Sequence, residues 1–447
     1  MAFNITLTMT YFAFLLGFGV IVANILKKRK IPDTFFLLIL GLLLGPTVFM
    51  NPALTKYVSI TLVDVSAMGA IPDFLRVWAL IMIVFTGTFN LNWKVFRRLS
   101  DVSINLAFVG MVFNTIIFGV AAHLIFGINI IYTLLLGAIL GGTGTGVLYA
   151  FEHTLSKSKK ALTIIKVESI FNSPLTVLLP ILFLDLINTE PGALIEPLKY
   201  MSQFWLMIVA GIGTGIVVGL AVSKLMRATL KEYTPLLLFS IALITYALAE
   251  NIGGSGMLAV AVCGLITGNM IFPEKEEVKR FDDQLSEMLR ISVFTLLGAQ
   301  VMMVFDLNLF IKSFVFFLII FFSRPIFLIP TLGKMKNRFT RSDILLMSFV
   351  APRGLAAAAM APIVARTISQ AAGNGVGNLI VNVIFLIMLF SVLFSTMSAA
   401  LISKFSHKKE RSAEENAVKH ETRDEPFVDV SKIPEDEKKI AGQNNQT

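Results

Sequence analysis

The sequence carries little charge for its length. Of 447 residues only 15% are charged, whereas 55% are hydrophobic, which exceeds the usual apolar content of a soluble globular protein. Cysteine is nearly absent, and the single Cys263 excludes an internal disulfide framework and a cysteine-based metal site. HExxH, GxSxG and P-loop motifs are also missing. We therefore expect neither an enzyme nor a resident cofactor or metal.

Long apolar runs are abundant instead, and each is close to the roughly 20 residues that cross a bilayer as a helix. We predict an all-α polytopic membrane protein with a transporter domain at 1–403. The charged, aromatic-poor residues 404–447 are predicted to be a disordered cytoplasmic tail. The thirteen predicted transmembrane helices lie at 9–26, 33–50, 74–93, 102–126, 128–151, 161–187, 201–223, 234–250, 254–272, 288–305, 308–330, 343–366 and 378–403.

The net charge of +9 is distributed unevenly along the chain. Alternate loops hold most of the basic residues, beginning with Lys27, Lys28, Arg29 and Lys30, while the intervening loops hold few. This asymmetry is the positive-inside pattern of membrane proteins. We therefore expect a lipid bilayer, not nucleic acid, as the partner of the basic surface, with the N-terminus outside the cell and the C-terminus in the cytoplasm.

Once the basic residues at the ends of spans are assigned to the loops, three remain deeper inside predicted spans: Lys166, Arg324 and Arg353. A charge at the centre of a membrane helix costs about 2.5 kcal/mol or more, so each needs a partner or an aqueous cavity. Glu168 is the clearest buried acid. We expect it to be the counter-ion of Arg353 or Lys166.

The sixth predicted span carries a polar stripe. Glu168, Asn172 and Thr176 follow i, i+4 spacing and share one helix face, with Ser169 and Ser173 on its flank. For Ser169 or Thr176 alone, a hydrogen bond to a neighbouring helix is a sufficient explanation. Glu168 together with Asn172 indicates a functional site, because a buried carboxylate needs compensation.

Two predicted spans are interrupted near their middle. The fifth contains Gly141, Gly142, Gly144 and Gly146, and a glycine cluster favours local unwinding of a helix. The twelfth is interrupted by the segment 352–354, which reads Pro-Arg-Gly. Irregular backbone at membrane depth is tolerated only where protein buries it or where it lines an aqueous cavity.

The positions of the two interruptions indicate inverted repeats, formed by spans one to six and eight to thirteen. Interrupted helices at corresponding places of two such halves are typical of the binding site of a secondary transporter. Thr143, Arg353 and Asn172 all lie roughly 12–17 Å from the cytoplasmic end of their spans, at about 1.5 Å per residue. We therefore expect the three residues to meet.

Several stretches resemble the monovalent cation:proton antiporters, the sodium/proton exchangers of bacteria and archaea. Residues 30–46, "KIPDTFFLLILGLLLGP", look like the second span of that family, and 80–92, "LIMIVFTGTFNLN", like the third. The stretches "LAENIGGSGMLAVAVCGLITGN" at 248–269 and "APRGLAAAAMA" at 351–361 are similar to later signatures of the family. The resemblance implies crossed broken helices in spans five and twelve, a six-helix transport core moving against a dimerisation domain, and a homodimer.

The departures from the family lie at the site that the resemblance implies. The usual T-D-P of span five reads Thr143-Gly144-Thr145, and in the usual E-S-x-x-N-D-P of span six Ser173 replaces the aspartate. Thr86 stands where the third span normally has an acid. By resemblance the ion-binding residues are expected to be Thr143, Gly144, Glu168, Asn172, Ser173 and Thr86, with Arg353 and Lys166 compensating charge.

These substitutions leave the coupling to protons open. Hydroxyl and carbonyl oxygens can coordinate a cation but do not exchange a proton at physiological pH. Either Glu168 carries the coupling, or the coupling has been altered or lost. The favoured hypothesis is exchange of Na+ or K+ for protons by alternating access. The alternatives are the same fold without proton coupling, as a cation uniporter or a transporter of another solute, and a non-transporting regulatory relative.

Overall fold

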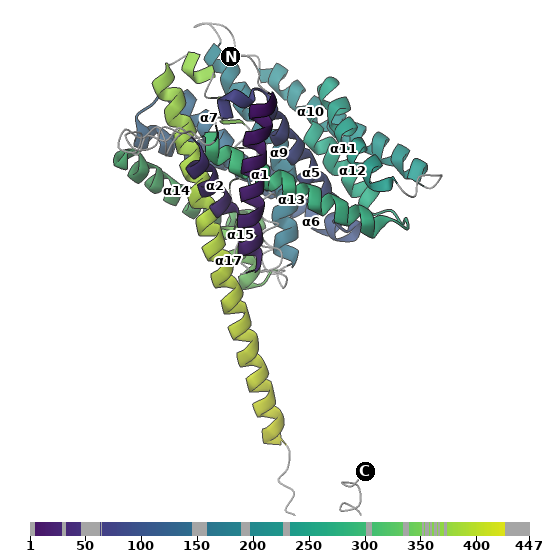
Figure 1. The fold of residues 1–447 in the computed structure, drawn as a ribbon. Coiled ribbons are helices and arrows are strands. Elements are labelled where there is room, and N and C mark those ends of the chain that lie inside the picture. Colours follow the sequence, from purple (N-terminus) through teal and green to yellow (C-terminus); the bar gives the residue numbers. More distant parts are fainter. Residues whose placement is uncertain are drawn as a thin grey trace, which may run out of the picture. The chain divides into compact units, whose positions relative to one another are not determined.

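The described part of the chain is helical (Figure 1). The computed structural model describes residues 5–28, 33–45, 63, 65–144, 159–188, 197–226, 233–300, 306–333, 339–350, 353, 357, 360, 361, 364, 367–370 and 373–424. Within these ranges every regular element is a helix and no strand occurs. The prediction of an all-α protein is confirmed for this part of the chain.

Each predicted span overlaps a described helix. The helices, together with one short 3-10 turn, are α1 (Ile5–Lys28), α2 (Thr34–Leu44), η1 (Val65–Met68), α5 (Ile71–Phe89), α6 (Trp93–Phe126), α7 (Ile130–Gly141), α9 (Lys159–Asn188), α10 (Pro197–Met226), α11 (Thr234–Asn251), α12 (Gly256–Gly268), α13 (Lys275–Gln300), α14 (Leu307–Leu332), α15 (Arg341–Phe349) and α17 (Asn374–Asp424).

Seven of the described helices contain a segment that is long and apolar enough to cross a membrane alone, so the protein is multi-pass. These segments are Ile5–Lys28, Ile71–Phe89, Trp93–Phe126, Met201–Lys224, Thr234–Asn251, Leu307–Leu332 and Gly375–Ala399. Helices α2, α7 and α12 are apolar but shorter.

Two helices begin well before the predicted spans. Helix α6 starts at Trp93 instead of 102, and α13 starts at Lys275 instead of 288. Hydropathy identifies only the part of a helix that suits hydrocarbon, whereas charged turns made of good helix formers extend it. For α6 the side chain of Asn92 fixes the start, because it accepts a hydrogen bond from the backbone N–H of Lys94 at 2.9 Å.

Helices α2 and α13 approach each other through glycine. A Cβ added at Gly298 would lie 2.8 Å from the backbone nitrogen of Leu42 and 2.9 Å from the Cα of Gly41, so there is no space for a side chain. Beside this contact, Arg290 of α13 forms a two-pronged salt bridge with Asp33, with N–O distances of 2.7 and 2.9 Å. Close backbone contact and a buried ion pair therefore hold the two helices together.

Substitution of Gly298 by alanine is expected to destabilise the protein by about 1–3 kcal/mol, because the added methyl group overlaps the backbone of α2. The measurement is thermal unfolding in detergent. The matched control is Gly17→Ala in α1, where the added Cβ meets nothing within 4 Å and alanine favours the helix. Equal melting temperatures for Gly298→Ala and Gly17→Ala would contradict the described contact.

The contacts divide the chain into two compact units, Met1–Ala400 and Leu401–Thr447. Helix α17 continues in the second unit as far as Asp424, so residues 404–424 are helical, although we predicted a disordered tail there. That stretch is rich in alanine, glutamate, lysine and arginine, which are good helix formers despite their charge. The remaining predicted tail, 425–447, lies outside the described residues.

Candidate functional site

The first interruption follows α7. The helix ends at Gly141, and Gly142 has extended backbone angles, φ −77° and ψ 150°. Thr143 and Gly144 follow, and both are buried. The side chain of Asn114, from α6, donates a hydrogen bond to the carbonyl oxygen of Gly141 at 2.9 Å. A side chain of a neighbouring helix therefore satisfies a carbonyl that the broken helix leaves without an intrahelical partner.

The polar face of α9 lies against this interruption. Ser169 donates its hydroxyl hydrogen to the carbonyl oxygen of Thr143 at 2.6 Å, and Asn172 Nδ2 donates to the hydroxyl oxygen of Thr143 at 3.2 Å. Thr176 donates to the carbonyl oxygen of Asn172 at 2.7 Å. All four side chains are buried. The predicted meeting of Thr143 and Asn172 is observed, and the helix break is fixed from both sides.

Two amide oxygens at this place have no hydrogen-bond donor. Oδ1 of Asn114 and Oδ1 of Asn172 are buried, and neither accepts a hydrogen bond from the described residues. Nearly all buried polar atoms in proteins have a partner, so acceptor oxygens without a donor among the described residues mark a place where a ligand can bind. Neutral amide, hydroxyl and carbonyl oxygens are suitable ligands for a monovalent cation.

Arg353 connects the second interruption to the first. Its Nη1 donates to the carbonyl oxygens of Gly141 and Gly142 at 3.1 and 3.3 Å, and its backbone N–H donates to the hydroxyl of Ser391, in α17, at 2.9 Å. The guanidinium carbon lies 5.2 Å from the ring centroid of Phe118, close enough for a cation–π interaction. The side chain is 2% exposed. Two helix interruptions that are far apart in the sequence are therefore joined by one arginine.

Glu168 is paired with a different arginine from those that the sequence analysis named. Arg324, in α14, donates to both carboxylate oxygens of Glu168, at 3.0 and 2.7 Å, and its Nε donates to the carbonyl oxygen of Met347 at 2.6 Å. Both charged groups are buried, with exposures of 2% for Glu168 and 3% for Arg324. The expected counter-ions, Arg353 and Lys166, are not the bidentate partner. The sequence does contain a sign of this partner, because Arg324 is one of the three basic residues that lie away from the ends of predicted spans.

The other predicted residues lie in different places. Thr86 is buried in α5, and its hydroxyl oxygen is 2.8 Å from that of Ser286 in α13, which is its hydrogen-bond partner within the described residues. Lys166 is buried in α9. Gly144 is buried directly after Thr143, whereas the side chain of Ser173 lies outside the described part. Sequence reasoning missed Asn114, which with Thr115 forms a polar pair in an otherwise apolar part of α6.

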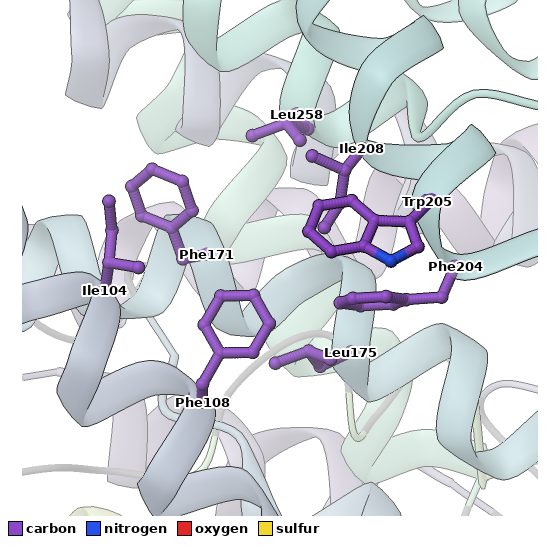
Figure 2. Close-up of a pocket in the computed structure, with 8 residues that line it drawn as sticks. All are labelled: Ile104, Phe108, Phe171, Leu175, Phe204, Trp205, Ile208 and Leu258. Carbon is purple, nitrogen blue, oxygen red and sulfur yellow. The ribbon is translucent and has the colours of Figure 1, made fainter. Parts of the chain in front are cut away.

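The protein also has a pocket of about 500 Å³ between helices α6, α9, α10 and α12 (Figure 2). Its walls are aromatic and aliphatic, formed by Ile104, Phe108, Phe171, Leu175, Phe204, Trp205, Ile208 and Leu258. A dehydrated cation needs oxygen ligands, which these side chains do not offer. The candidate ion site is therefore the buried polar cluster around Thr143 and not this pocket.

Comparison with known proteins gives consistent results. Residues 12–404 match the family described as the transmembrane sodium/hydrogen exchangers. The probable Na(+)/H(+) antiporter 2 of Methanocaldococcus jannaschii is 29% identical over 317 residues, covering 67% of this chain and 70% of the relative. The Na(+)/H(+) antiporter 1 of the same organism is 29% identical over 376 residues, covering 79% and 82%.

A solved structure has a similar fold. It is that of the sodium proton antiporter MjNhaP1 from Methanocaldococcus jannaschii at pH 8, with a TM-score of 0.72 and 22% sequence identity. The similarity covers 89% of this chain and 98% of that chain. At this identity the likeness shows a common fold.

Proposed function

This chain belongs to the sodium/hydrogen exchanger family, and we propose that it exchanges a monovalent cation, Na+ or K+, for protons across a membrane by alternating access. One observation carries the proposal. The interruptions at Gly142 and Arg353 meet inside the protein beside acceptor oxygens that lack a donor among the described residues. Interrupted helices of this kind form the substrate sites of secondary transporters.

For the ion ligands we propose the hydroxyl of Thr143 and Oδ1 of Asn172, completed by Gly144 and Ser173. The hydrogen bond between Thr143 and Asn172 supports this assignment, because it places two neutral oxygen-bearing side chains together. A ring of neutral oxygens suits Na+ and also K+, which is less strongly hydrated. Thr86, paired with Ser286, is proposed to lie on the ion path.

The charged residues are proposed to support the site. Arg353 bonds the C-terminal end of α7. With Lys166 it offsets negative charge, including the partial negative charge of the carbonyl groups at that helix end. Glu168 fixes the rotation of α9 through its pair with Arg324. Rotation matters because it decides whether Asn172 faces the interruption.

We further propose a homodimer in the cell membrane with the N-terminus outside and the C-terminus in the cytoplasm. The distribution of basic residues over alternate loops supports this orientation. Dimerisation follows from the resemblance to the antiporters. Cross-linking in membranes tests the dimer, and labelling of single cysteines introduced before Ile5 and after Asp424 tests the orientation.

The second candidate function is cation transport without proton coupling. It is favoured by the Glu168–Arg324 pair, because both oxygens of the Glu168 carboxylate already accept charge-assisted hydrogen bonds, and the side chains of Thr143 and Asn172 are neutral. Purified protein in proteoliposomes separates the two functions. Exchange predicts that an imposed Na+ or K+ gradient changes the internal pH, whereas electrogenic cation flux that ignores a pH gradient indicates a uniporter.

Substitution of Asn172 by alanine is expected to raise the half-saturating cation concentration about tenfold, because the loss of one oxygen ligand costs about 1.4 kcal/mol. The measurement is the initial rate of cation uptake against cation concentration. The control is Asn251→Ala in α11, an exposed asparagine whose side chain donates a hydrogen bond to Ala247 of its own helix. Unchanged saturation in Asn172→Ala would remove this residue from the proposed site.

A further inference from the structure

One buried carboxyl group differs from the others. Four carboxylates are buried among the described residues: Asp33, Glu168, Asp282 and Asp343. Three of them have partners, because Asp33 binds Arg290, Glu168 binds Arg324, and Asp343 accepts hydrogen bonds at the N-terminus of α15. Asp282 has an exposure of 0%, and neither of its oxygens accepts a hydrogen bond from the part of the chain that the structure describes.

Asp282 lies at the end of α13 that we predict to be cytoplasmic, before the predicted span 288–305. It precedes Ser286 by one helical turn, so the two side chains share one face of the helix. The hydroxyl of Ser286 reaches that of Thr86 in α5 at 2.8 Å. Asp282, Ser286 and Thr86 therefore mark a polar line along the contact between α13 and α5.

Among the described residues, no cationic side chain donates a hydrogen bond to Asp282, and Lys279 and Arg280 on its own helix are exposed. On its own helix the neighbouring charges are Lys275, Lys279, Arg280 and Asp283, and the ammonium group of Lys275 already bonds the carbonyl oxygen of Gly268 and lies over the ring of Phe89. Four helices that pack against α13 carry charged residues or begin next to one. Helix α5 has Asp73 and Arg76, and α11 has Glu250, in each case at the end far from Asp282. Helix α1 has Lys27 and Lys28, and Asp33, which precedes α2, binds Arg290 beside Glu287.

Burial raises the pKa of Asp282 to about 7, and the negative charge of Asp283 contributes as the second, smaller cause. A carboxyl group with this pKa is present in both its neutral and its charged form near neutral pH. The side chains of Thr143 and Asn172 are a hydroxyl and an amide group and do not offer such a group.

We propose that Asp282 is the carboxyl group that takes up and releases the exchanged proton; this inference rests on the proposed exchange function. The carboxyl group is fully buried and has no hydrogen-bond partner among the described residues, which favours its neutral form. A conformation that admits water to α13 favours the carboxylate, so the O–H bond breaks and the proton passes to water. Protonation is thereby linked to the conformational equilibrium that alternating access requires.

The test compares Asp282→Asn with Asp283→Asn, its exposed neighbour with the same change of charge. Proteoliposomes are given a Na+ gradient, or a K+ gradient in a parallel series, and two quantities are measured: the change in internal pH, and the exchange of radioactive cation for the same unlabelled cation. We expect the change in internal pH to be at least tenfold smaller in Asp282→Asn than in wild type, while cation-for-cation exchange is kept. Wild type and Asp283→Asn keep both, and the pH profile of Asp283→Asn moves to lower pH because the charge that helps to raise the pKa of Asp282 is gone.

The outcomes separate the inference from the proposed function. If wild type itself gives no pH change, exchange fails as the function, and the inference falls with it. If wild type gives a pH change and Asp282→Asn gives the same change with the same pH profile, the inference alone is overturned. Should Asp282→Asn lose both activities, infrared difference spectra of wild type decide: a carboxylic-acid band that titrates near pH 7 and is missing in Asp282→Asn supports the inference, and its absence overturns it.

Discussion

Replacement of Arg324 by methionine is expected to destabilise the protein by about 3–5 kcal/mol, the largest effect of any single substitution considered. The guanidinium group donates to both carboxylate oxygens of Glu168 and to the carbonyl oxygen of Met347. Its removal leaves a buried carboxylate without compensation and a buried carbonyl without its donor. The measurement is thermal unfolding of the detergent-purified protein, followed by loss of its size-exclusion peak.

The control for this prediction removes both charges. In Glu168→Met combined with Arg324→Met, two apolar side chains replace the ion pair, and such replacements are often neutral or stabilising. We therefore expect the double variant to melt well above Arg324→Met. If the single variant melts like wild type, or if the double variant is no better than the single one, the pair does not hold α9 to α14.

Replacement of Arg353 by methionine is expected to destabilise the protein by about 3 kcal/mol and to slow cation uptake. The substitution removes two charge-assisted hydrogen bonds to the carbonyl oxygens of Gly141 and Gly142, each bond to a charged group contributing about 1.5–3 kcal/mol, together with the contact over Phe118. Asn114 still donates to Gly141, so the loss is greatest at Gly142. Unfolding temperature and initial uptake rate measure the two effects.

Arg353→Lys is the matched variant, because it keeps the charge and loses the planar fork of donors. A partial recovery of uptake relative to Arg353→Met is expected. Full recovery would mean that only the charge of Arg353 matters, and no recovery would mean that the geometry of its hydrogen bonds matters most. Wild-type stability and uptake in Arg353→Met would contradict the role given to this side chain.

Much of the fold could be predicted from the sequence, because membrane-spanning helices must be apolar over a length that the bilayer sets. The break after Gly141 was foreseen for a local reason, since a glycine cluster weakens a helix wherever it occurs. The early start of α13 at Lys275 was not foreseen. Its first turns are charged, so hydropathy does not distinguish them from a loop.

The candidate site was predicted in part. The contact between Thr143 and Asn172 agrees with the similar depth of the two residues in their spans, which the sequence supplies, and Arg353 bonds the carbonyl oxygens of Gly141 and Gly142 just before Thr143. The partner of Glu168 did not follow, because depth says nothing about which helices are neighbours or how each is rotated. Arg324 lies 156 residues from Glu168, and only the packing of α14 against its neighbours makes the pair.

The pairing of Glu168 with Arg324 also determines which buried charges respond to the membrane voltage. Membrane voltage does work on any charge that moves through its field, about 2.3 kcal/mol per elementary charge for 100 mV. A tightly held pair moves equal and opposite charges together, so its displacement transfers no net charge. The side-chain hydrogen-bond partners of Arg353 in the described part of the chain are neutral carbonyl oxygens, and its charge is not cancelled in this way. Voltage therefore acts on Arg353 and on any other uncompensated charge that moves through the field, whereas displacement of the Glu168–Arg324 pair does no electrical work.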